Sequence, residues 1–360
     1  MATAEQLLQA LQTVVDPNTG TDFVTTKALK NLQVAGGDVS FDVELGYPAK
    51  SQIPALRRAL IAAVRSVAGV ENVSANVTQK IVAHAAQRGV ALLPKVKNII
   101  AVASGKGGVG KSTTAVNLAL AAEGASVGLL DADIYGPSQP MMMGIEGRPE
   151  STDGQTMEPM ENHGVQVMSI GFLVDKDEAM IWRGPMATQA LDQLLRQTNW
   201  KDLDYLIVDM PPGTGDIQLT LSQRVPMTGA VIVTTPQDIA LLDARKGIKM
   251  FEKVGVPILG IVENMAVHVC SQCGHVEHIF GAEGGKKMAA EYGMDYLGAL
   301  PLSMQIRVQA DSGNPTVVAD PDSEVAGIYR TVARQVAIKV AAKAKDFSSK
   351  FPSIRISKDT

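Results

Sequence analysis

The chain has 360 residues, of which 46% are hydrophobic and 19% charged, so it can bury a full core and is not disordered. A formal net charge of −4, without a basic stripe, argues against sequence-independent binding to nucleic acid. The two cysteines, Cys270 and Cys273, are three positions apart, which excludes a disulfide framework and is typical of a reducing cytosol. The longest apolar stretch, Val254 to Val269, contains Glu263 and Asn264, so no membrane span is predicted. The N-terminus lacks a signal-peptide pattern, and we expect a cytoplasmic protein without membrane or nucleic-acid partners.

The first 79 residues predict a small α/β domain. Apolar and polar residues alternate from Val39 to Leu45 and from Val73 to Val77, as in half-buried strands. Between them lies an apolar pattern with helical spacing, and we expect Ser51 to cap that helix. Residues 80–97 mix Ala, Gln, Arg, Gly and Pro without a strand pattern and are predicted to form a linker.

From residue 98 onwards, short apolar runs alternate with helical stretches. The runs show little alternation, as expected of strands covered on both faces. They are Asn98–Ala103, Ser126–Leu130, Val165–Ile170, Tyr205–Met210, Ala230–Thr234, Ile258–Val262 and Tyr296–Leu300. The helical stretches include Ser112–Ala122, Ala187–Gln197 and Ile239–Val254. This order predicts an α/β fold with a doubly wound, mostly parallel sheet over residues 98–345, followed by a polar tail at 346–360.

A glycine-rich segment follows the first of these strands and opens a helix. It matches the phosphate-loop pattern GxxxxGK[ST] in the required strand–loop–helix context. Its members are Gly105, Lys106, Gly107, Gly108, Val109, Gly110, Lys111, Ser112 and Thr113. The glycines allow backbone N–H groups to surround phosphate oxygens at a helix N-terminus. We therefore expect Lys111 to bridge the β- and γ-phosphates of a nucleotide and the Ser112 hydroxyl to ligate Mg²⁺.

Lys106, directly after the first glycine, makes this segment resemble the deviant-Walker ATPases. That class includes nitrogenase iron protein and the bacterial septum-site and plasmid-partition ATPases. The resemblance implies a homodimer in which Lys106 reaches the phosphates of the partner's nucleotide. There it would neutralise charge in the way an arginine finger does.

The same resemblance assigns roles to residues at the ends of later strands. Asp131 and Asp133 would begin switch I, with Asp133 orienting the attacking water and Asp131 nearer the magnesium. Asp209 would be the Walker B carboxylate, and Gly213 would lie in switch II. Asn264 resembles the residue that contacts adenine in this class. ATP is preferred over GTP because the guanine-reading motif Asn-Lys-x-Asp is absent from the sequence.

Cys270 and Cys273 form a CxxC motif, with His268, His275 and His278 nearby. Three kinds of site are compatible with this motif. A thioredoxin-like redox pair belongs at a helix start in a much smaller fold. A zinc site would take two of the histidines as further ligands. A [4Fe–4S] cluster commonly takes four thiolates, which two subunits together would supply.

With both motifs, the chain resembles the Mrp/ApbC family of iron–sulfur cluster carrier ATPases over nearly its whole length, and residues 1–79 resemble its MIP18-type module (domain of unknown function 59). The matching segments are Gly105–Thr113, Asp131–Ser138, Trp182–Pro185, Asp209–Asp216, Thr235–Asp238, Glu263–Gly274 and Pro315–Val318. The resemblance implies an ATP hydrolase whose homodimer holds a [4Fe–4S] cluster between Cys270 and Cys273 of both subunits. It would receive the cluster from an assembly scaffold and deliver it to apo iron–sulfur proteins.

Two other functions use many of the same residues. A spatial-positioning ATPase acting on a membrane or nucleoid would need a basic amphipathic C-terminal helix. The chain offers Arg330 and Lys339 beside Val332, Val336 and Val340, but we expect these valines to pack on the sheet. A zinc-stapled ATPase dimer would differ only in the metal that the cysteines hold.

Overall fold

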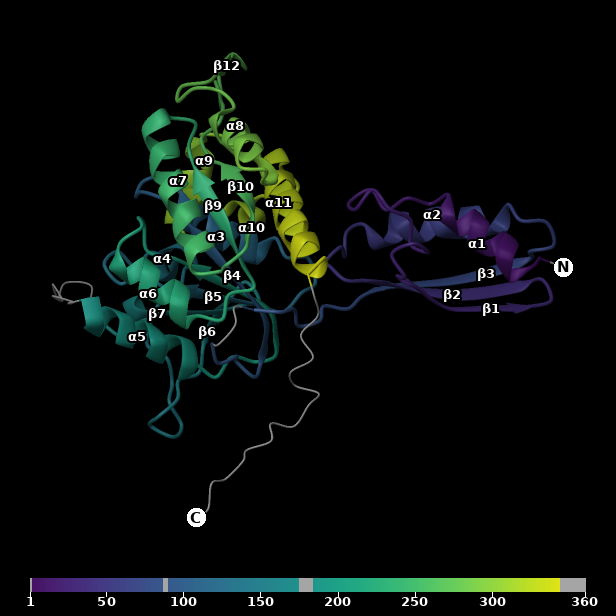
Figure 1. Cartoon of the computed structure of the whole chain (residues 1–360), viewed down its shortest axis with the longest axis horizontal. Helices are drawn as coiled ribbons and strands as arrows, with labels where there is room; N and C mark the ends of the chain where they lie inside the picture. Colours follow the sequence, from purple (N-terminus) through teal and green to yellow (C-terminus); the bar gives the residue numbers. More distant parts are fainter. Residues whose placement is uncertain (1, 87–89, 175–183, 344–360) are drawn as a thin grey trace.

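The computed structural model describes residues 2–86, 90–174 and 184–343 and has two lobes (Figure 1). The predicted tail at 346–360 lies outside the described residues, as do Trp182 and Arg183 of one matching segment. The small N-terminal lobe, residues 2–79, holds a three-stranded sheet with two helices. The large lobe, residues 96–343, is built on an eight-stranded sheet.

The small lobe confirms the two strands predicted from alternation and the helix predicted from helical spacing. Its elements are α1 (Ala4–Gln12), β1 (Leu29–Ala35), β2 (Asp38–Leu45), α2 (Ile53–Arg65) and β3 (Asn72–Gln79). Strand β2 lies between antiparallel β1 and parallel β3 and buries every second residue against the helices. The prediction for Ser51 is wrong: α2 begins one residue later, after Gln52, without a side-chain cap. The Ser51 hydroxyl is bound elsewhere, as described below.

The large lobe confirms the predicted doubly wound sheet. Its strand order is β13-β10-β9-β4-β8-β5-β7-β6, parallel except for the edge strand β6. The strands are β4 (Val96–Ala103), β5 (Val127–Asp131), β6 (Met160–Asn162), β7 (Val165–Ser169), β8 (Leu203–Asp209), β9 (Gly229–Thr234), β10 (Ile258–Glu263) and β13 (Tyr296–Ala299). Strands β5 and β9 are buried along their whole length, which explains why they show apolar runs without alternation.

Helices flank this sheet, and a separate two-stranded hairpin projects from one end of it (Figure 1). The helices are α3 (Lys111–Leu120), α4 (Gln139–Met142), the 3₁₀ turn η1 (Ile170–Phe172), α5 (Gly184–Arg196), α6 (Asp216–Arg224), α7 (Asp238–Lys253), α8 (Gly284–Glu291), α9 (Met304–Asp311), α10 (Thr316–Ala319) and α11 (Glu324–Ala341). The hairpin consists of β11 (His268–Val269) and β12 (Val276–Glu277). In α11 the valines Val332, Val336 and Val340 are buried, as predicted. Across the described ranges, no helix has the length and apolar character needed to cross a membrane.

Glu123, just after α3, joins the two lobes. Its carboxylate accepts a hydrogen bond from the Ser51 hydroxyl at 2.8 Å and pairs with Arg334 of α11 at 3.3 Å. Its backbone carbonyl accepts a hydrogen bond from Gln79 Nε2 at 3.2 Å. Among the described residues, every hydrogen bond between the two lobes ends on Glu123. The small lobe is therefore attached at the end of the helix that begins at the phosphate loop.

Replacing Glu123 by alanine is expected to loosen the small lobe. The substitution removes the contacts with Ser51 and leaves Arg334, whose side chain is 11% exposed, without its carboxylate. We expect a loss of about 2–3 kcal/mol in the free energy of unfolding. The radius of gyration in small-angle scattering should increase. Glu291→Ala, which removes an exposed ion pair with Arg245, is the control, and an unchanged radius for Glu123→Ala would contradict the assignment.

Candidate functional site

The phosphate loop connects β4 to α3 at the carboxyl ends of the parallel strands, where ligands bind in open α/β sheets. Gly108 and Gly110 have φ of 80° and 79°, which residues with a side chain rarely adopt. A Cβ on Gly105 would lie 2.1 Å from the backbone of Asp243 in α7. The loop therefore requires glycine both for its conformation and for its packing against α7.

Lys111 lies at the base of this loop and is directed toward the neighbouring carboxylates. Its side chain is 6% exposed, and Nζ forms an ion pair with Oδ1 of Asp209. Nζ also lies 3.0 Å from Oγ of Ser112. The structure thus brings together the predicted phosphate lysine, the predicted Mg²⁺ ligand and the predicted Walker B carboxylate.

Asp131 and Asp209 are paired residues on adjacent parallel strands, which places two buried carboxylates side by side. Burial raises the pKa of Asp131 to about 7, and the nearby charge of Asp209 acts in the same direction. Hydrogen bonds from the Gln139 backbone and the Ser169 hydroxyl oppose this rise. Burial also raises the pKa of Asp133, while Lys111 lowers it. An arrangement that raises carboxylate pKa values is suited to a bound cation.

Gln139, the first residue of α4, is a site residue that sequence reasoning missed. It is fully buried, and its Nε2 donates to Oδ2 of Asp209 at 2.8 Å and to the backbone carbonyl of Ser112 at 3.1 Å. Its Oε1 and the neighbouring Ser138 Oγ are buried without a hydrogen-bond partner in the described part of the chain. Oxygen atoms with unused acceptor capacity beside carboxylates are suited to a hydrated Mg²⁺ ion. The residues present therefore fit the predicted magnesium.

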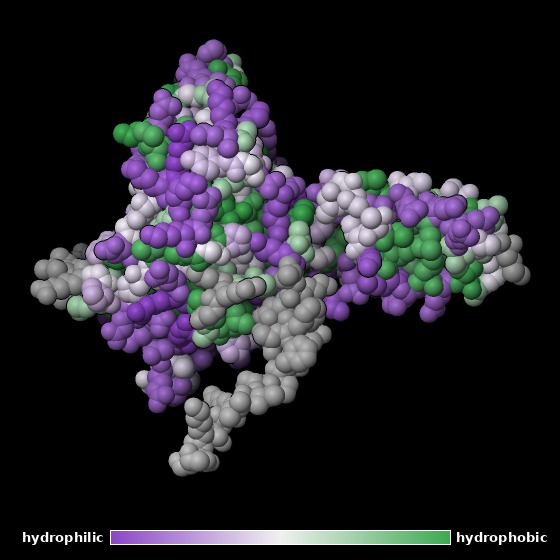
Figure 2. Space-filling view, in the orientation of Figure 1, coloured by the Kyte–Doolittle hydropathy of each residue, from purple (hydrophilic) through white to green (hydrophobic). Residues whose placement is uncertain are grey.

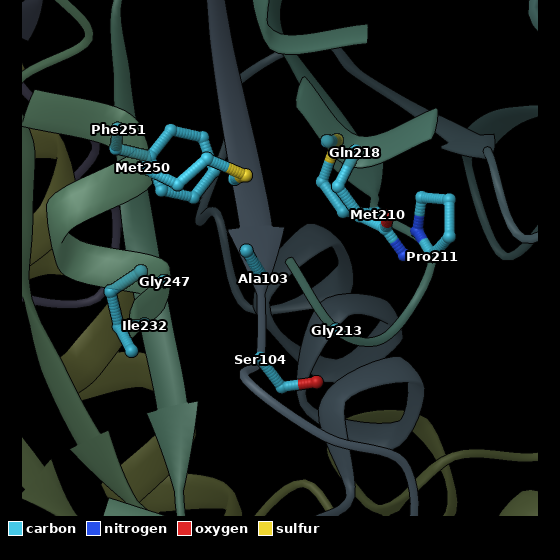
Figure 3. A pocket seen from close by; sticks show the side chains of 10 residues that line it. All are labelled: Ala103, Ser104, Met210, Pro211, Gly213, Gln218, Ile232, Gly247, Met250 and Phe251. Atoms are coloured by element: carbon cyan, nitrogen blue, oxygen red, sulfur yellow. The ribbon is translucent and has the colours of Figure 1, made fainter. Parts of the chain in front are cut away.

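Lys106 lies within the phosphate loop, and the segment predicted to be switch II contacts the end of β4 just before the loop. Lys106 is partly exposed, and within the described residues its Nζ has no ion-pair partner. Gly213 donates its N–H to the Ser104 carbonyl at 3.0 Å, which holds the predicted switch II segment against the end of β4. Figure 3 shows Ser104 beside the loop that contains Met210 and Gly213, with Met250 and Phe251 across β4.

Asn264 connects the phosphate loop to the segment that carries the cysteines. Its Nδ2 donates to the Val109 carbonyl at 2.9 Å, and its backbone N–H donates to the Thr234 carbonyl at 2.7 Å. A Cβ on Gly110 would lie 2.0 Å from Asn264 Nδ2, so the two segments are in close contact. The side chain predicted to contact adenine thus lies against the loop itself.

Cys270 and Cys273 lie in the turn of the β11–β12 hairpin, which projects from the large lobe (Figure 1). Cys270 donates its N–H to the His275 carbonyl at 2.9 Å, and Gly274, with φ of 71°, donates to the Cys270 carbonyl at 2.9 Å. Hydrogen bonds from the Gln272 and Cys273 backbones, and from the Cys273 side chain, lower the pKa of the Cys270 thiol. The turn therefore favours the thiolate, which is the metal-binding form.

The surroundings of the hairpin are exposed and partly apolar. Val269 and Val276 face each other across it and are 51% and 53% exposed. Figure 2 shows apolar residues among hydrophilic ones at this end of the molecule. Cys273 is exposed and Cys270 partly so, and both are free thiols. A group bound here would be accessible to another protein.

Two of the nearby histidines are bound to backbone carbonyls of the large lobe. Nδ1 of His268 is 3.1 Å from the Leu302 carbonyl, and Nδ1 of His278 is 2.9 Å from the Ala266 carbonyl. These contacts attach the base of the hairpin to the large lobe. In the described residues, no group of three or more His, Cys, Asp or Glu side chains is arranged to hold a metal ion. Among the described residues, the two cysteines and two of the histidines are therefore not gathered around one point as zinc ligands would be.

Known proteins match this chain over most of its sequence. The iron-sulfur cluster carrier protein of Pseudomonas fragi is 61% identical over 275 residues, covering 75% of this chain and 96% of that protein. The carrier protein of Escherichia coli (strain K12) is 54% identical over 324 residues, covering 89% of this chain and 87% of that protein. The iron-sulfur cluster transfer protein NUBPL of Mus musculus is 54% identical over 245 residues, covering 67% of this chain and 77% of that protein.

A solved structure also matches about two thirds of the chain. The nucleotide-binding protein from Archaeoglobus fulgidus in complex with ADP is 37% identical, with a TM-score of 0.56, and covers 64% of this chain and 90% of that chain. A family model described as NUBPL iron-transfer P-loop NTPase matches residues 95–337. A model described as iron-sulfur cluster assembly protein matches residues 4–77. The chain therefore belongs to the NUBPL family of iron-transfer P-loop NTPases, which confirms the resemblance inferred from its motifs.

Proposed function

We propose that this protein is an ATP-dependent iron–sulfur cluster carrier that acts as a homodimer. The observation that carries the proposal is a pair of free thiols, one exposed and one partly exposed, on a projecting hairpin of a chain that also has a phosphate loop. No third ligand is grouped with them among the described residues. Two such hairpins would supply the four thiolates of a bridging [4Fe–4S] cluster. Its donor would be an assembly scaffold and its acceptors apo iron–sulfur proteins, as the names of the relatives suggest.

In the proposed nucleotide site, the loop N–H groups and Lys111 bind the phosphates of ATP. Ser112 and Asp209 would hold Mg²⁺, directly and through water respectively, and the ion would neutralise phosphate charge. Asp133 would orient the attacking water, and Lys106 of the partner subunit would stabilise the charge of the transition state. For this reaction Lys111 has to exchange its ion pair with Asp209 for the phosphates.

The contact between Asn264 and Val109 gives the nucleotide a route to the cysteines. Asn264 lies six positions before Cys270, and the segment between them is held to the large lobe through Ala266 and His268. A shift of the phosphate loop on ATP binding or hydrolysis would therefore reach the hairpin base. We propose that this shift, together with dimer closure through Lys106, controls cluster retention.

We further propose that residues 1–79 and 98–345 are separate domains joined by residues 80–97, although β4 already begins at Val96. The N-terminal module contains no cysteine, so it cannot hold the cluster by thiolates. Docking of partner proteins is the role that we assign to it.

Anaerobic reconstitution of the full chain with iron and sulfide tests the function. We expect about two iron and two sulfide atoms per chain, visible absorbance and a dimer in size-exclusion chromatography. Zinc bound at one ion per dimer, without sulfide, would instead support the zinc-stapled dimer. A reconstituted protein that holds neither metal would contradict both.

A further inference from the structure

Gln139 connects three parts of the nucleotide site that are far apart in the sequence. Its backbone N–H donates to Asp131 Oδ2 at 3.0 Å. Its side-chain Nε2 donates to Asp209 Oδ2 and to the Ser112 carbonyl, at 2.8 and 3.1 Å. The Asp209 carboxylate and the Ser112 backbone carbonyl can only accept hydrogen bonds, so the amide nitrogen of Gln139 has to face them. The orientation of the Gln139 amide is therefore fixed by its partners.

This orientation leaves Gln139 Oε1 as a buried acceptor without a donor in the described part of the chain. A buried acceptor without a partner is unfavourable, and such groups in native proteins call for an explanation. Its side chain is 0% exposed, so bulk water does not satisfy it. Water molecules bound to a cation are strong hydrogen-bond donors. The Asp209 carboxylate contacts this amide, and the Asp131 carboxylate contacts the backbone N–H of the same residue.

The second argument concerns what holds Asp209. Lys111 and Gln139 contact opposite oxygens of its carboxylate. Lys111 has to leave Asp209 when it binds phosphate, whereas Gln139 is fixed by its contacts with Asp131 and Ser112. Gln139 then remains as the side-chain donor that orients Asp209 in the nucleotide-bound state.

We propose that Gln139 is a positioning residue for magnesium: its Nε2 orients Asp209, and its Oε1 accepts a hydrogen bond from a water molecule on the ion. Groups that orient the ligands of a metal commonly contribute 10–100-fold to its affinity. The inference rests on the proposed magnesium–nucleotide site and does not depend on the cluster.

The test is ADP binding to the full chain by calorimetry, with Mg²⁺ and with EDTA, for Gln139→Leu, which keeps a similar volume without polar atoms. We expect the concentration of Mg²⁺ needed for half-maximal enhancement of ADP binding to rise about ten-fold. ADP affinity in EDTA should stay within about two-fold of the wild type, because the phosphate loop is intact. A purely structural role would instead weaken ADP binding equally under both conditions.

Gln309→Leu is the matched control, because Gln309 Oε1 is also buried without a partner but contacts neither carboxylate in the structure. Its Mg²⁺ dependence should equal that of the wild type. If Gln139→Leu does not fold, Gln139→Asn, whose shorter amide cannot span the same partners, should show the same selective loss. An unchanged Mg²⁺ dependence in a folded variant would overturn the inference. Absence of any Mg²⁺ dependence in the wild type would overturn the proposed magnesium site itself.

Discussion

Replacing Lys106 by alanine is expected to lower ATP hydrolysis about 10³-fold while ATP binding is retained. Cations supplied in trans to a transferring phosphoryl group contribute effects of this size. Among the described residues, Lys106 Nζ has no ion-pair partner, whereas Lys111 Nζ forms an ion pair with Asp209. Lys111→Ala should therefore abolish hydrolysis too, but with weakened nucleotide binding. Turnover under saturating ATP and binding by calorimetry separate the two variants.

A mixing experiment determines on which subunit Lys106 acts. In a heterodimer of Lys106→Ala and Lys111→Ala chains, the first chain keeps its own Lys111 and receives Lys106 from its partner. Random mixing makes about half of the dimers heterodimers with one complete site each, so roughly a quarter of wild-type activity should return. No recovery would mean that Lys106 acts within its own chain. Lys201→Ala, which removes an exposed lysine paired with Glu158, is the control for the loss of a positive charge.

The fold could be predicted from the sequence wherever burial determines residue type. Strands such as β9, buried along both faces, show the uninterrupted apolar runs that parallel sheets require. Strand β1 was missed because it has little alternation, with Asn31 at φ of 51° and an irregular register between Lys30 and Gln33. The β11–β12 hairpin was missed because strands of two residues have no periodicity.

The site could be predicted where a motif requires a residue type for its chemistry, as in Lys111 and Asp209. Gln139 and Glu123 have no such signal. Each acts through partners distant in the sequence, 70 positions away for the contact of Gln139 with Asp209 and 72 for that of Glu123 with Ser51. Only the folded topology brings these partners together, so local pattern reasoning does not identify them.

Replacing Cys270 or Cys273 by alanine, even singly, is expected to abolish stable cluster binding. One substitution removes two of four thiolates, because both subunits of the homodimer carry it. Iron and sulfide per dimer after anaerobic reconstitution should fall from about four of each to nearly none. Replacing Cys270 should lower the iron and sulfide content at least as much as replacing Cys273, because backbone hydrogen bonds in the turn lower the pKa of the Cys270 thiol.

His275→Ala is the matched control, since His275 lies exposed in the same turn and its ring faces Glu277 at 3.6 Å rather than a cysteine. It should keep the full iron and sulfide content, because its backbone carbonyl still accepts the N–H of Cys270. Mixed dimers of wild-type and double-cysteine variant chains should bind no cluster, because they retain two thiolates. Clusters in these mixed dimers would show that one hairpin is sufficient, and the two-subunit site would then be wrong. A cluster that survives in the double variant would place the ligands elsewhere, since the chain contains no other cysteine.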